Sequence, residues 1–358
     1  MAVYRIFPTK DASIFSYYPD KNSGIDEILD ISIYKSVEET GEVARALVAF
    51  DSNEISNILT SKIGDSNYKS YLKLFQANAT GIPLEYTLEC HPISGSWNNG
   101  TGRTANVPQT TNGVSWNYRD NSSGSIFTAS AVGSTSYYPS GSPGGGSWYS
   151  SASLEATQSF TLLSSKDIEI DVTSAVSGGY YENGFIIMHS DTLEFLTSSL
   201  FELKFFSRDT HTIYPPCLEF RWDDFSYTTG SLSIVTSDHI VVSLNNNKGE
   251  YFEDSVSRFR LNVRDRYPTR VFQTSSLYTT NKVLPTASYY AIQDIKTDEI
   301  VIDFDTSYTK LSSDSEGNYF DIYMNGLQPE RYYKILIKTI IDNNTLVFED
   351  NNYFKIVK

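Results

Sequence analysis

Apolar and polar residues alternate along most of this chain of 358 residues. In the segment 167–172, Ile168, Ile170 and Val172 fall on one face of an extended chain and three acidic residues fall on the other. The same alternation occurs in four further segments: 200–206, 217–222, 299–304 and 333–341. A period of two residues is typical of antiparallel strands with one face in water. Short runs of this kind, separated by Gly, Asn, Ser and Pro, predict an all-β chain of sandwiches or barrels.

One short helix is predicted, in residues 51–59. Asp51 or Ser52 can cap its N-terminus, because a side-chain oxygen at that position accepts a bond from a free backbone N–H. Apolar residues, including Ile55 and Ile58, would then face the core.

Residues 95–153 lack strand alternation and are rich in Gly, Ser and Asn. A flexible linker has this composition, but large aromatic rings recur through the segment, from Trp97 to Tyr149. A long loop held against a sandwich by its rings explains both features. Because strand alternation resumes at Ser159, we predict an aromatic-pinned insertion inside one domain.

The domain boundary is predicted in residues 221–231, where a strand ends in two acids and a Thr-Gly turn. The first domain would cover residues 1–224 and a smaller β domain residues 225–358. Within the second, "GLQPERYYKILIK" (326–338) resembles the turn and tyrosine-containing strand of immunoglobulin-like and fibronectin-like sandwiches. We therefore expect an immunoglobulin-like C-terminal β domain.

Composition excludes several classes of protein. A net charge of −15 argues against a nucleic-acid partner, because backbone binding requires Lys and Arg. No apolar run approaches the roughly 20 residues of a membrane span, so no membrane partner is predicted. The two cysteines are too few for a disulfide framework. The first residues lack the apolar segment of a signal peptide, so we expect synthesis and folding in a cytoplasm.

Catalytic signatures are missing from the sequence. The four histidines lie far apart, and neither a GxSxG nor a GxxxxGK motif is present. Paired acids such as Asp223 and Asp224 could serve a glycosidase, but acids at alternate strand positions usually form a solvated face. We predict no enzyme, no catalytic residue and no cofactor. A structural Ca²⁺ in the acidic turn 314–318 is the one alternative, since hard cations take oxygen ligands.

One basic segment stands out in this acidic chain. Its arginines, called here the arginine stripe, are Arg258, Arg260, Arg264, Arg266 and Arg270. In an unbroken strand the first four share one face, while Phe259, Leu261 and Val263 face inward. We expect the stripe to form an interface with an acidic neighbouring subunit, or to pair with acids of this chain, because Arg suits planar carboxylate pairing.

The insertion carries the candidate ligand-binding or interface residues. They are Trp97, Asn98, Asn99, Arg103, Trp116 and Trp148. Indole rings could stack on a sugar, with the amides and Arg103 supplying hydrogen bonds. Alternatively, the rings pack under the loop or anchor an interface. Packing is favoured first, an interface second and a sugar third, because large exposed apolar area is rare on soluble monomers.

Seven segments within the first 224 residues resemble, in order, those of a known family. They are "FPTKDASIFS", "NSGIDEILDI", "RALVAFD", "LEYTLECHPISGSWNNGTG", "GVSWNYRD", "IEIDVTSAV…ENGFIIM" and "FFSRDTHTIYPPCLEF". Together they resemble the DNRLRE-type, carbohydrate-binding-module-like jelly roll, although the DNRLRE string itself is absent. The resemblance implies a jelly-roll β-sandwich over residues 1–224.

A particular variant of this family is closest in pattern. The segments "MAVYRIFPTKDASIFS", "GSWNNGTGR" and "SRDTHTIYPPCLEFRWDD" resemble virion structural proteins of tailed phages, from marine T4-like and crAss-like phages. This resemblance implies a non-enzymatic component of the neck, tail or fibre region, assembled in the bacterial host cytoplasm with other virion proteins and copies of itself. The alternative function is a carbohydrate-binding module that recognises a host-surface or environmental glycan.

Overall fold

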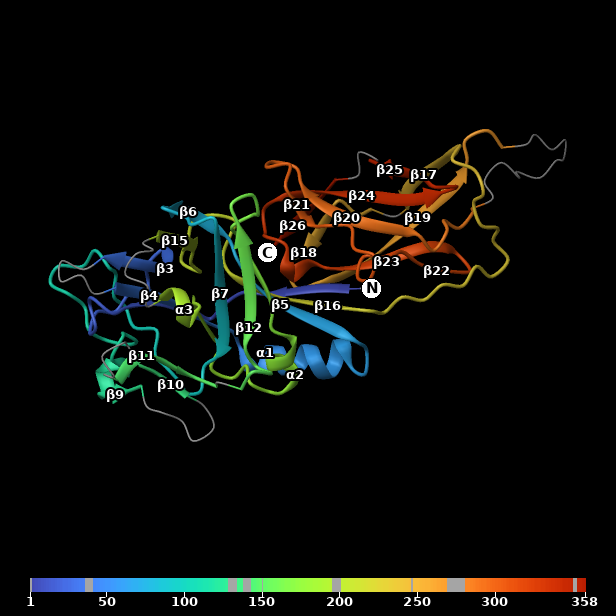
Figure 1. Cartoon of the computed structure of the whole chain (residues 1–358). Helices are drawn as coiled ribbons and strands as arrows, with labels where there is room; N and C mark the ends of the chain where they lie inside the picture. The colour runs from blue at the N-terminus through green and yellow to red at the C-terminus, as the bar shows by residue number, and fades with distance from the viewer. Residues whose placement is uncertain are drawn as a thin grey trace. The chain divides into compact units, whose positions relative to one another are not determined.

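A computed structural model describes residues 2–35, 41–127, 134–137, 143–149, 151–194, 201–245, 247–268, 281–349 and 353–358. Strands dominate it, with a few short helices (Figure 1), and the prediction of an all-β chain is confirmed. The chain forms two compact units. The N-terminal unit contains Ile6–Gly64 and Lys69–Glu219, and the C-terminal unit contains Met1–Arg5, Asp65–Tyr68 and Phe220–Lys358.

The N-terminal unit is built on one large antiparallel sheet. Its strand order is β12-β7-β14-β4-β3-β15-β6, and β2 also pairs with β4. These strands are β2 (Lys10–Phe15), β3 (Ile28–Lys35), β4 (Gly41–Ala49), β6 (Gln76–Thr80), β7 (Glu85–Pro92), β12 (Ala156–Thr161), β14 (Phe185–His189) and β15 (Phe201–Phe206). A further antiparallel pair joins β13 (Ile168–Asp171) to β5 (Tyr68–Leu74). Ile168 and Ile170 are buried, and Glu169 and Asp171, which alternate with them, are exposed, as the alternation predicts.

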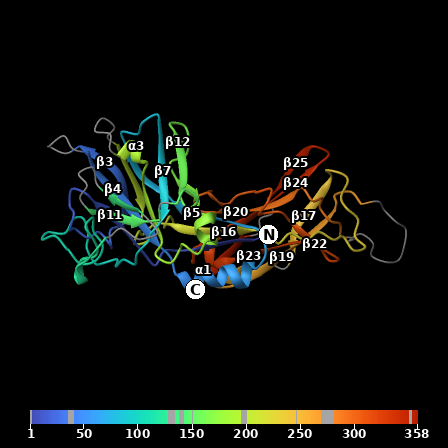
Figure 2. The ribbon, with the colours of Figure 1, turned by 60° about the horizontal axis from the view of Figure 1, so that its bottom comes forward.

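Short helices connect these strands. The predicted helix is confirmed as α1 (Ser52–Asn57), which is labelled in Figure 2. Asp51 caps it by accepting a bond from the Asn53 N–H, and the chain continues as a π-helical segment, Ile58–Ile63. The described residues of this unit also form α2 (Thr173–Ser177), α3 (Asp191–Glu194) and a 3-10 turn at Asn121–Ser123.

The predicted insertion lies between β7 and β12, which are antiparallel neighbours in the large sheet. The chain therefore leaves this strand pair and returns to it, so the insertion is part of one unit. It contains its own short strands, which the sequence pattern did not predict. They are β8 (Tyr118–Asp120) paired with β9 (Ser125–Ile126), and β10 (Ser134–Tyr137) paired with β11 (Pro143–Trp148).

The C-terminal unit is a sandwich of two sheets, with orders β17-β19-β23-β22 and β18-β26-β24-β20-β21. Its strands are β17 (Ile240–Asn245), β18 (Glu250–Phe252), β19 (Val256–Asp265), β20 (Ser288–Asp294), β21 (Ile300–Ile302), β22 (Ser312–Asp314), β23 (Gly317–Tyr323), β24 (Tyr332–Ile341), β25 (Asn344–Phe348) and β26 (Tyr353–Val357). With β17, β19, β20, β22, β23, β24 and β26 taken as A to G, the first sheet is A-B-E-D and the second contains G-F-C. This is the order of an immunoglobulin-like sandwich.

A tyrosine corner supports the same assignment. Tyr333 is the second residue of β24, and its hydroxyl accepts a bond from the Gln328 N–H at 2.8 Å and donates to the Gln328 carbonyl at 3.2 Å. Such a tyrosine at the start of strand F, bonded to backbone a few residues upstream, is characteristic of these sandwiches. The expectation drawn from "GLQPERYYKILIK" is confirmed.

The compact units differ from the boundaries expected from the sequence. Val3, in strand β1 (Ala2–Ile6), belongs to the hydrophobic core of the C-terminal unit. Arg5 donates to the Val301 carbonyl, and the Tyr4 ring lies 5.4 Å from that of Tyr323. These contacts place residues 2–5 with the C-terminal unit, although their sequence belongs to the segment 1–224.

Candidate functional site

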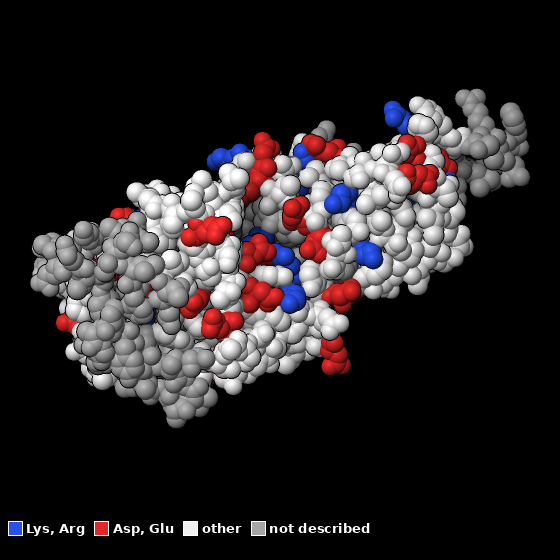
Figure 3. All heavy atoms as spheres, in the orientation of Figure 1, with Lys and Arg blue, Asp and Glu red and all other residues white. Residues whose placement is uncertain are grey.

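Acidic side chains occupy many separate places on the face drawn in Figure 3, with Lys and Arg between them. In the described part of the chain, no group of three or more His, Cys, Asp or Glu residues is arranged to hold a metal ion. No helix there is long and apolar enough to cross a membrane.

Trp97 is buried, with 4% of its surface exposed. Its indole N–H donates to the Asn183 carbonyl at 2.9 Å, and the Lys10 ammonium lies 4.5 Å from the ring centroid. Lys10 also donates to the Trp97 carbonyl at 2.6 Å. Burial lowers the pKa of the Lys10 ammonium. The ring therefore packs the start of the insertion against the unit and offers no free face for stacking.

Asn99 likewise serves the local structure. Its amide donates to the Gly24 carbonyl at 2.5 Å. From the other side, the Asn22 amide donates to the carbonyls of Asn99 and Val114, each at 2.8 Å, and its oxygen accepts from the Gly102 N–H at 2.7 Å. The "NSG" and "NNGTG" segments of the sequence are thus two sides of one hydrogen-bonded contact.

Glycine is required in this contact because the backbones approach closely. A Cβ at Gly102 would lie 2.4 Å from the Asn22 carbonyl oxygen, and one at Gly24 would lie 1.9 Å from the Asn99 carbonyl oxygen. The neighbouring Asn98 amide reaches the Asp120 carboxylate at 3.4 Å, a long contact. The Asn99 amide is thus used inside the protein, whereas Asn98 is exposed and lines a small groove with Arg119 and Asp120. Because the Trp97 ring is buried, neither amide borders an open stacking platform.

Trp116 and Trp148 enclose a buried cation. The Arg45 guanidinium lies 5.0 Å from the Trp116 ring centroid and 5.4 Å from that of Trp148. It forms two bonds with Glu194, at 2.7 and 2.5 Å, and donates to the Gly145 carbonyl at 2.7 Å. Arg45 and Glu194 are at most 1% exposed. The arrangement ties the insertion to β4 and α3.

All three tryptophans of the candidate set are therefore covered, with at most 7% of their surface exposed. The stacking platform of the glycan alternative does not exist at these rings. Each indole is instead enclosed by side chains of the same unit, which is the packing alternative that the sequence favoured. No local signal marks Arg45 or Glu194 as the partners, because the contact joins segments 149 residues apart.

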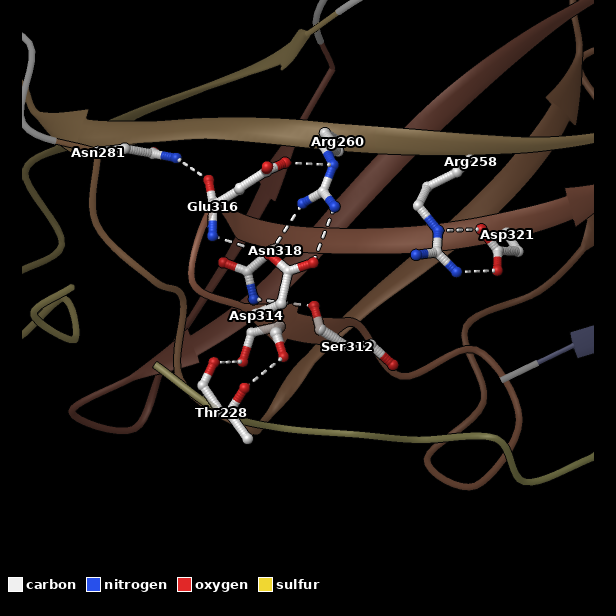
Figure 4. A network of polar contacts seen from close by, with 10 residues as sticks. Thr228, Arg258, Arg260, Asn281, Ser312, Asp314, Glu316, Asn318 and Asp321 are labelled. Carbon is white, nitrogen blue, oxygen red and sulfur yellow. Dashed lines mark hydrogen bonds and ion pairs between the residues drawn. The ribbon is translucent and has the colours of Figure 1, made fainter. Parts of the chain in front are cut away.

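Arg258, Arg260 and Arg264 of the arginine stripe lie on β19, which ends at Asp265. The inward neighbours Phe259, Leu261 and Val263 are buried as predicted. Arg258 forms two bonds of 2.8 Å with Asp321, directly opposite on β23 (Figure 4). Its guanidinium also lies 4.2 Å from the Tyr319 ring centroid. The hydrogen bonds that Arg258 donates to the Asp321 carboxylate are the main cause of a raised pKa at Arg258.

Arg260 has a similar environment. It forms two bonds with Asp314, at 2.9 and 2.8 Å, and lies 3.2 Å from Glu316 (Figure 4). The bond from Arg260 is the main cause of a lowered pKa at Asp314. The acidic turn considered for calcium thus supplies carboxylates to an arginine. For Arg258 and Arg260, the structure shows the alternative of pairing with acids of the same chain.

The other arginines of the stripe differ. Arg264 donates to the Asp265 carbonyl at 3.3 Å, and the Arg266 guanidinium lies 5.8 Å from the Tyr267 ring centroid. No ion pair of either arginine is recorded within the described ranges. Arg270 lies outside the described residues. An interface role for these three stays a prediction.

A groove beside Arg103 was missed by the sequence interpretation. Its volume is about 630 Å³, and it is lined by Phe15, Tyr17, Asp26, Glu27, Ile28, Asp30, Tyr34, Arg103, Thr104, Ala105 and Lys204. We call it the tyrosine groove. The rings of Tyr17 and Tyr34 meet edge to face, with centroids 5.2 Å apart. Aromatic surface and charged groups of both signs therefore share one concave surface.

Strand register places the charges of the groove. Asp30 on β3 is directly opposite Lys204 on β15. The Asp30 carboxylate accepts bonds from Ser32 and from the Tyr34 hydroxyl, at 2.6 Å for the latter, and burial raises its pKa. Arg103 lies 3.6 Å from Glu27 at the rim. Alternation in "DISIY" (30–34) predicts that Asp30 and Tyr34 lie on one face of the strand. The position of Lys204 beside them depends on the pairing of β15 with β3.

The sequence matches no protein-family model and no curated protein. Among solved structures, the chain is weakly similar to a DUF4785 family protein from Legionella pneumophila, with 7% identity and a TM-score of 0.19 over 98% of this chain and 66% of that chain. It is also weakly similar to a β-glucuronidase from Parabacteroides merdae, with 9% identity and a TM-score of 0.16 over 81% of this chain and 28% of that chain. The chain spans less than two thirds of the length of either protein. Similarities of this size carry no information about function.

Proposed function

We propose that this chain is a non-enzymatic structural protein of a tailed-phage virion, in the neck, tail or fibre region. It acts through contacts with other virion proteins and with copies of itself, after synthesis in the bacterial host cytoplasm. Two resemblances motivate the proposal: seven ordered N-terminal segments resemble the DNRLRE-type jelly roll, and three segments resemble the variant found in such virion proteins. It needs no catalytic centre, nucleic acid or membrane.

The observation that carries the proposal is the use of conspicuous residues for internal rigidity. The indoles of Trp116 and Trp148 enclose the Arg45–Glu194 pair, and Arg258 is held by Asp321. Residue types that often serve ligand binding here fix loops and strands. A fold held rigid by such internal contacts suits an assembly protein. Its surface is preorganised, so it loses little conformational entropy when it docks.

Peptide mass spectrometry on purified particles of the phage that encodes this chain tests the proposal. We expect a constant ratio of this chain to the major capsid protein through successive gradient purifications. Host cytoplasmic proteins serve as the control, since their ratio falls at each step. Loss of the chain in parallel with those host proteins would contradict the proposal.

A second function, glycan binding, is favoured by the tyrosine groove. Tyr17 and Tyr34 offer aromatic surface, and Asp30, Glu27 and Lys204 offer polar groups, in one cavity of about 630 Å³. Specific sites commonly combine an apolar lining with a few placed polar groups. This groove takes the place of the tryptophan platform as the candidate glycan site.

A glycan array followed by calorimetry tests this second function. Tyr17→Ala should weaken binding of any glycan found on the array by about five- to tenfold, since a lost stacking contact is worth roughly 1–1.5 kcal/mol. Tyr332→Ala is the matched control, because Tyr332 is an exposed tyrosine of the C-terminal unit. An array without binding, or equal effects of the two substitutions, would reject this function.

A further inference from the structure

Strand β25 is an open edge of the C-terminal unit. It follows β24 through the two-residue turn Asp342–Asn343, and both turn residues have positive φ, 48° and 63°. Positive φ at both central positions defines the type I′ turn of a tight hairpin. The hairpin is seen in Figures 1 and 2, with β25 beside β24. Within the described residues, β25 pairs only with β24.

Strand register shows which backbone groups of β25 are free. Ile341 and Asn344 flank the turn, so they form the first hydrogen-bonded pair of the hairpin, and such pairs alternate with pairs that are not bonded. Ile340 and Thr345 form the next pair, which is not bonded. In agreement, the Ile340 N–H points away from β25 and donates to the Ala287 carbonyl at 3.0 Å. The N–H and C=O groups of Thr345, and by the same alternation of Val347, therefore point to the open edge.

This edge lacks the usual protection against pairing. Proteins normally shield an edge strand with a charged residue, a proline, a bulge or a very short strand. The sequence of β25, "NTLVF", has no charge and no proline, and it runs for five residues. The other edge strands of this sheet, β18 and β21, have three residues each. Val347 is also 54% exposed, next to the exposed Ile340 of β24.

We propose that β25 pairs antiparallel with β25 of a second copy of this chain, about a twofold axis at Leu346. In this register Thr345 of one copy faces Val347 of the other, so the four outward groups of each copy bond to those of its partner. The central Leu346 residues face each other as a pair that is not hydrogen-bonded. An isologous contact of this kind closes as a dimer.

Charge favours this location for self-association. A net charge of −15 repels copies of the chain from one another. Strand β25 brings no acid to the contact, and Lys338 of β24 is directly opposite Val347. Glu349, just after the strand, is paired with Lys334. The Lys338 ammonium lies 4.6 Å from the Phe304 ring centroid. Two copies can therefore approach along this edge without placing like charges opposite each other within β25.

Sedimentation velocity of the full chain over a concentration series is the first test. Val347→Pro removes an N–H that points to the open edge and leaves the bonds to β24 in place, so we expect loss of the dimer. At dilutions where the wild type is monomeric, the two proteins should have the same melting temperature. Val347→Thr keeps the N–H and is the matched control, with dimerisation equal to that of the wild type. The inference does not depend on the proposed virion role, because it concerns the purified chain alone.

Cysteine cross-linking tests the register. Residues in a pair that is not hydrogen-bonded have Cα atoms about 4.5 Å apart, so oxidised Leu346→Cys should form a disulfide dimer. Thr345→Cys should not, since its two copies would lie about 8–9 Å apart at 3.4 Å per residue. The wild type is the control, because Cys90 and Cys217 are buried.

The pattern that supports the inference is a cross-link at Leu346→Cys but not at Thr345→Cys, lost when Val347→Pro is added. A cross-link at Thr345→Cys, no cross-link at Leu346→Cys, or a dimer that withstands Val347→Pro would each overturn it.

Discussion

Glu194 holds Arg45 through two hydrogen bonds in the interior of the N-terminal unit, between the rings of Trp116 and Trp148. Both charges are removed from water, and each has its partner. Removing one partner of a buried ion pair leaves an uncompensated charge, which costs more than the pair itself contributes.

We therefore expect Glu194→Gln to lower the free energy of unfolding by about 3–5 kcal/mol. Urea unfolding followed by tryptophan fluorescence measures this change, since three of the four tryptophans lie in the N-terminal unit. Lys69→Met is the control: the Lys69–Asp171 pair is 44% and 41% exposed, and its loss should cost less than about 1 kcal/mol. Equal effects of the two substitutions would contradict the role assigned to the pair.

Tyr333→Phe tests the tyrosine corner. The substitution removes the hydroxyl that bonds to both backbone groups of Gln328, and we expect the C-terminal unit to lose about 1–3 kcal/mol of stability. Hydrogen-exchange mass spectrometry of that unit measures the loss. The adjacent Tyr332 is exposed, so Tyr332→Phe should leave exchange unchanged. If the tyrosine corner contributed nothing to stability, both variants would show the same hydrogen exchange.

Stability should depend on pH through Asp11. Burial is the main cause that raises the pKa of this carboxyl to about 7, against the opposing bond from the Arg208 N–H. An unfolded aspartate titrates near pH 4. Between about pH 4 and 7 the folded state thus binds a proton that the unfolded state has lost, so the contribution of Asp11 to stability falls as pH rises through this window.

Asp11→Asn removes that titration. The stability of the variant relative to the wild type should increase from pH 4 to pH 7, by roughly 4 kcal/mol at about 1.4 kcal/mol per pKa unit, and stay level above pH 8. Urea unfolding at several pH values gives this difference, in which the titration of other groups, including the low pKa of buried His189, cancels. A difference that does not vary with pH would show that the Asp11 carboxyl titrates alike in both states.

Iodide quenching tests the burial of the tryptophans. All four indoles are covered, so iodide should hardly reduce the emission of the native protein. The urea-unfolded chain is the control and should be quenched strongly. Strong quenching of the native protein would show that an indole of the insertion is accessible to solvent. That result would contradict the packing interpretation and support stacking on a sugar.

Much of the fold followed from local pattern. Alternation placed Phe259, Leu261 and Val263 inward on β19, a capping acid at Asp51 marked the only predicted helix, and a tyrosine after a turn marked the immunoglobulin-like unit. These features depend on residues close together in the sequence. Local sequence pattern was therefore sufficient to predict these three features.

Far less of the candidate site could be predicted from local sequence pattern. Whether Trp97 lies open or buried depends on Asn183 and Lys10, which the sequence does not place beside it. Lys204 enters the tyrosine groove only because β15 pairs with β3 in one particular register. Alternation predicts faces of strands, but it does not predict which strands are neighbours, so long-range partners could not be found this way.

Strand β1 has a consequence for the order of events during synthesis. Val3 is synthesised more than 200 residues before Val235, which is the next residue of its hydrophobic core in the described part of the chain. The first strand must wait for more than half of the chain before its partners exist, while nearly all residues of the N-terminal unit are already present. Contacts this distant in sequence form late and slowly, so a chaperone or a transient local partner that shields residues 2–5 would raise the yield of correctly folded chains.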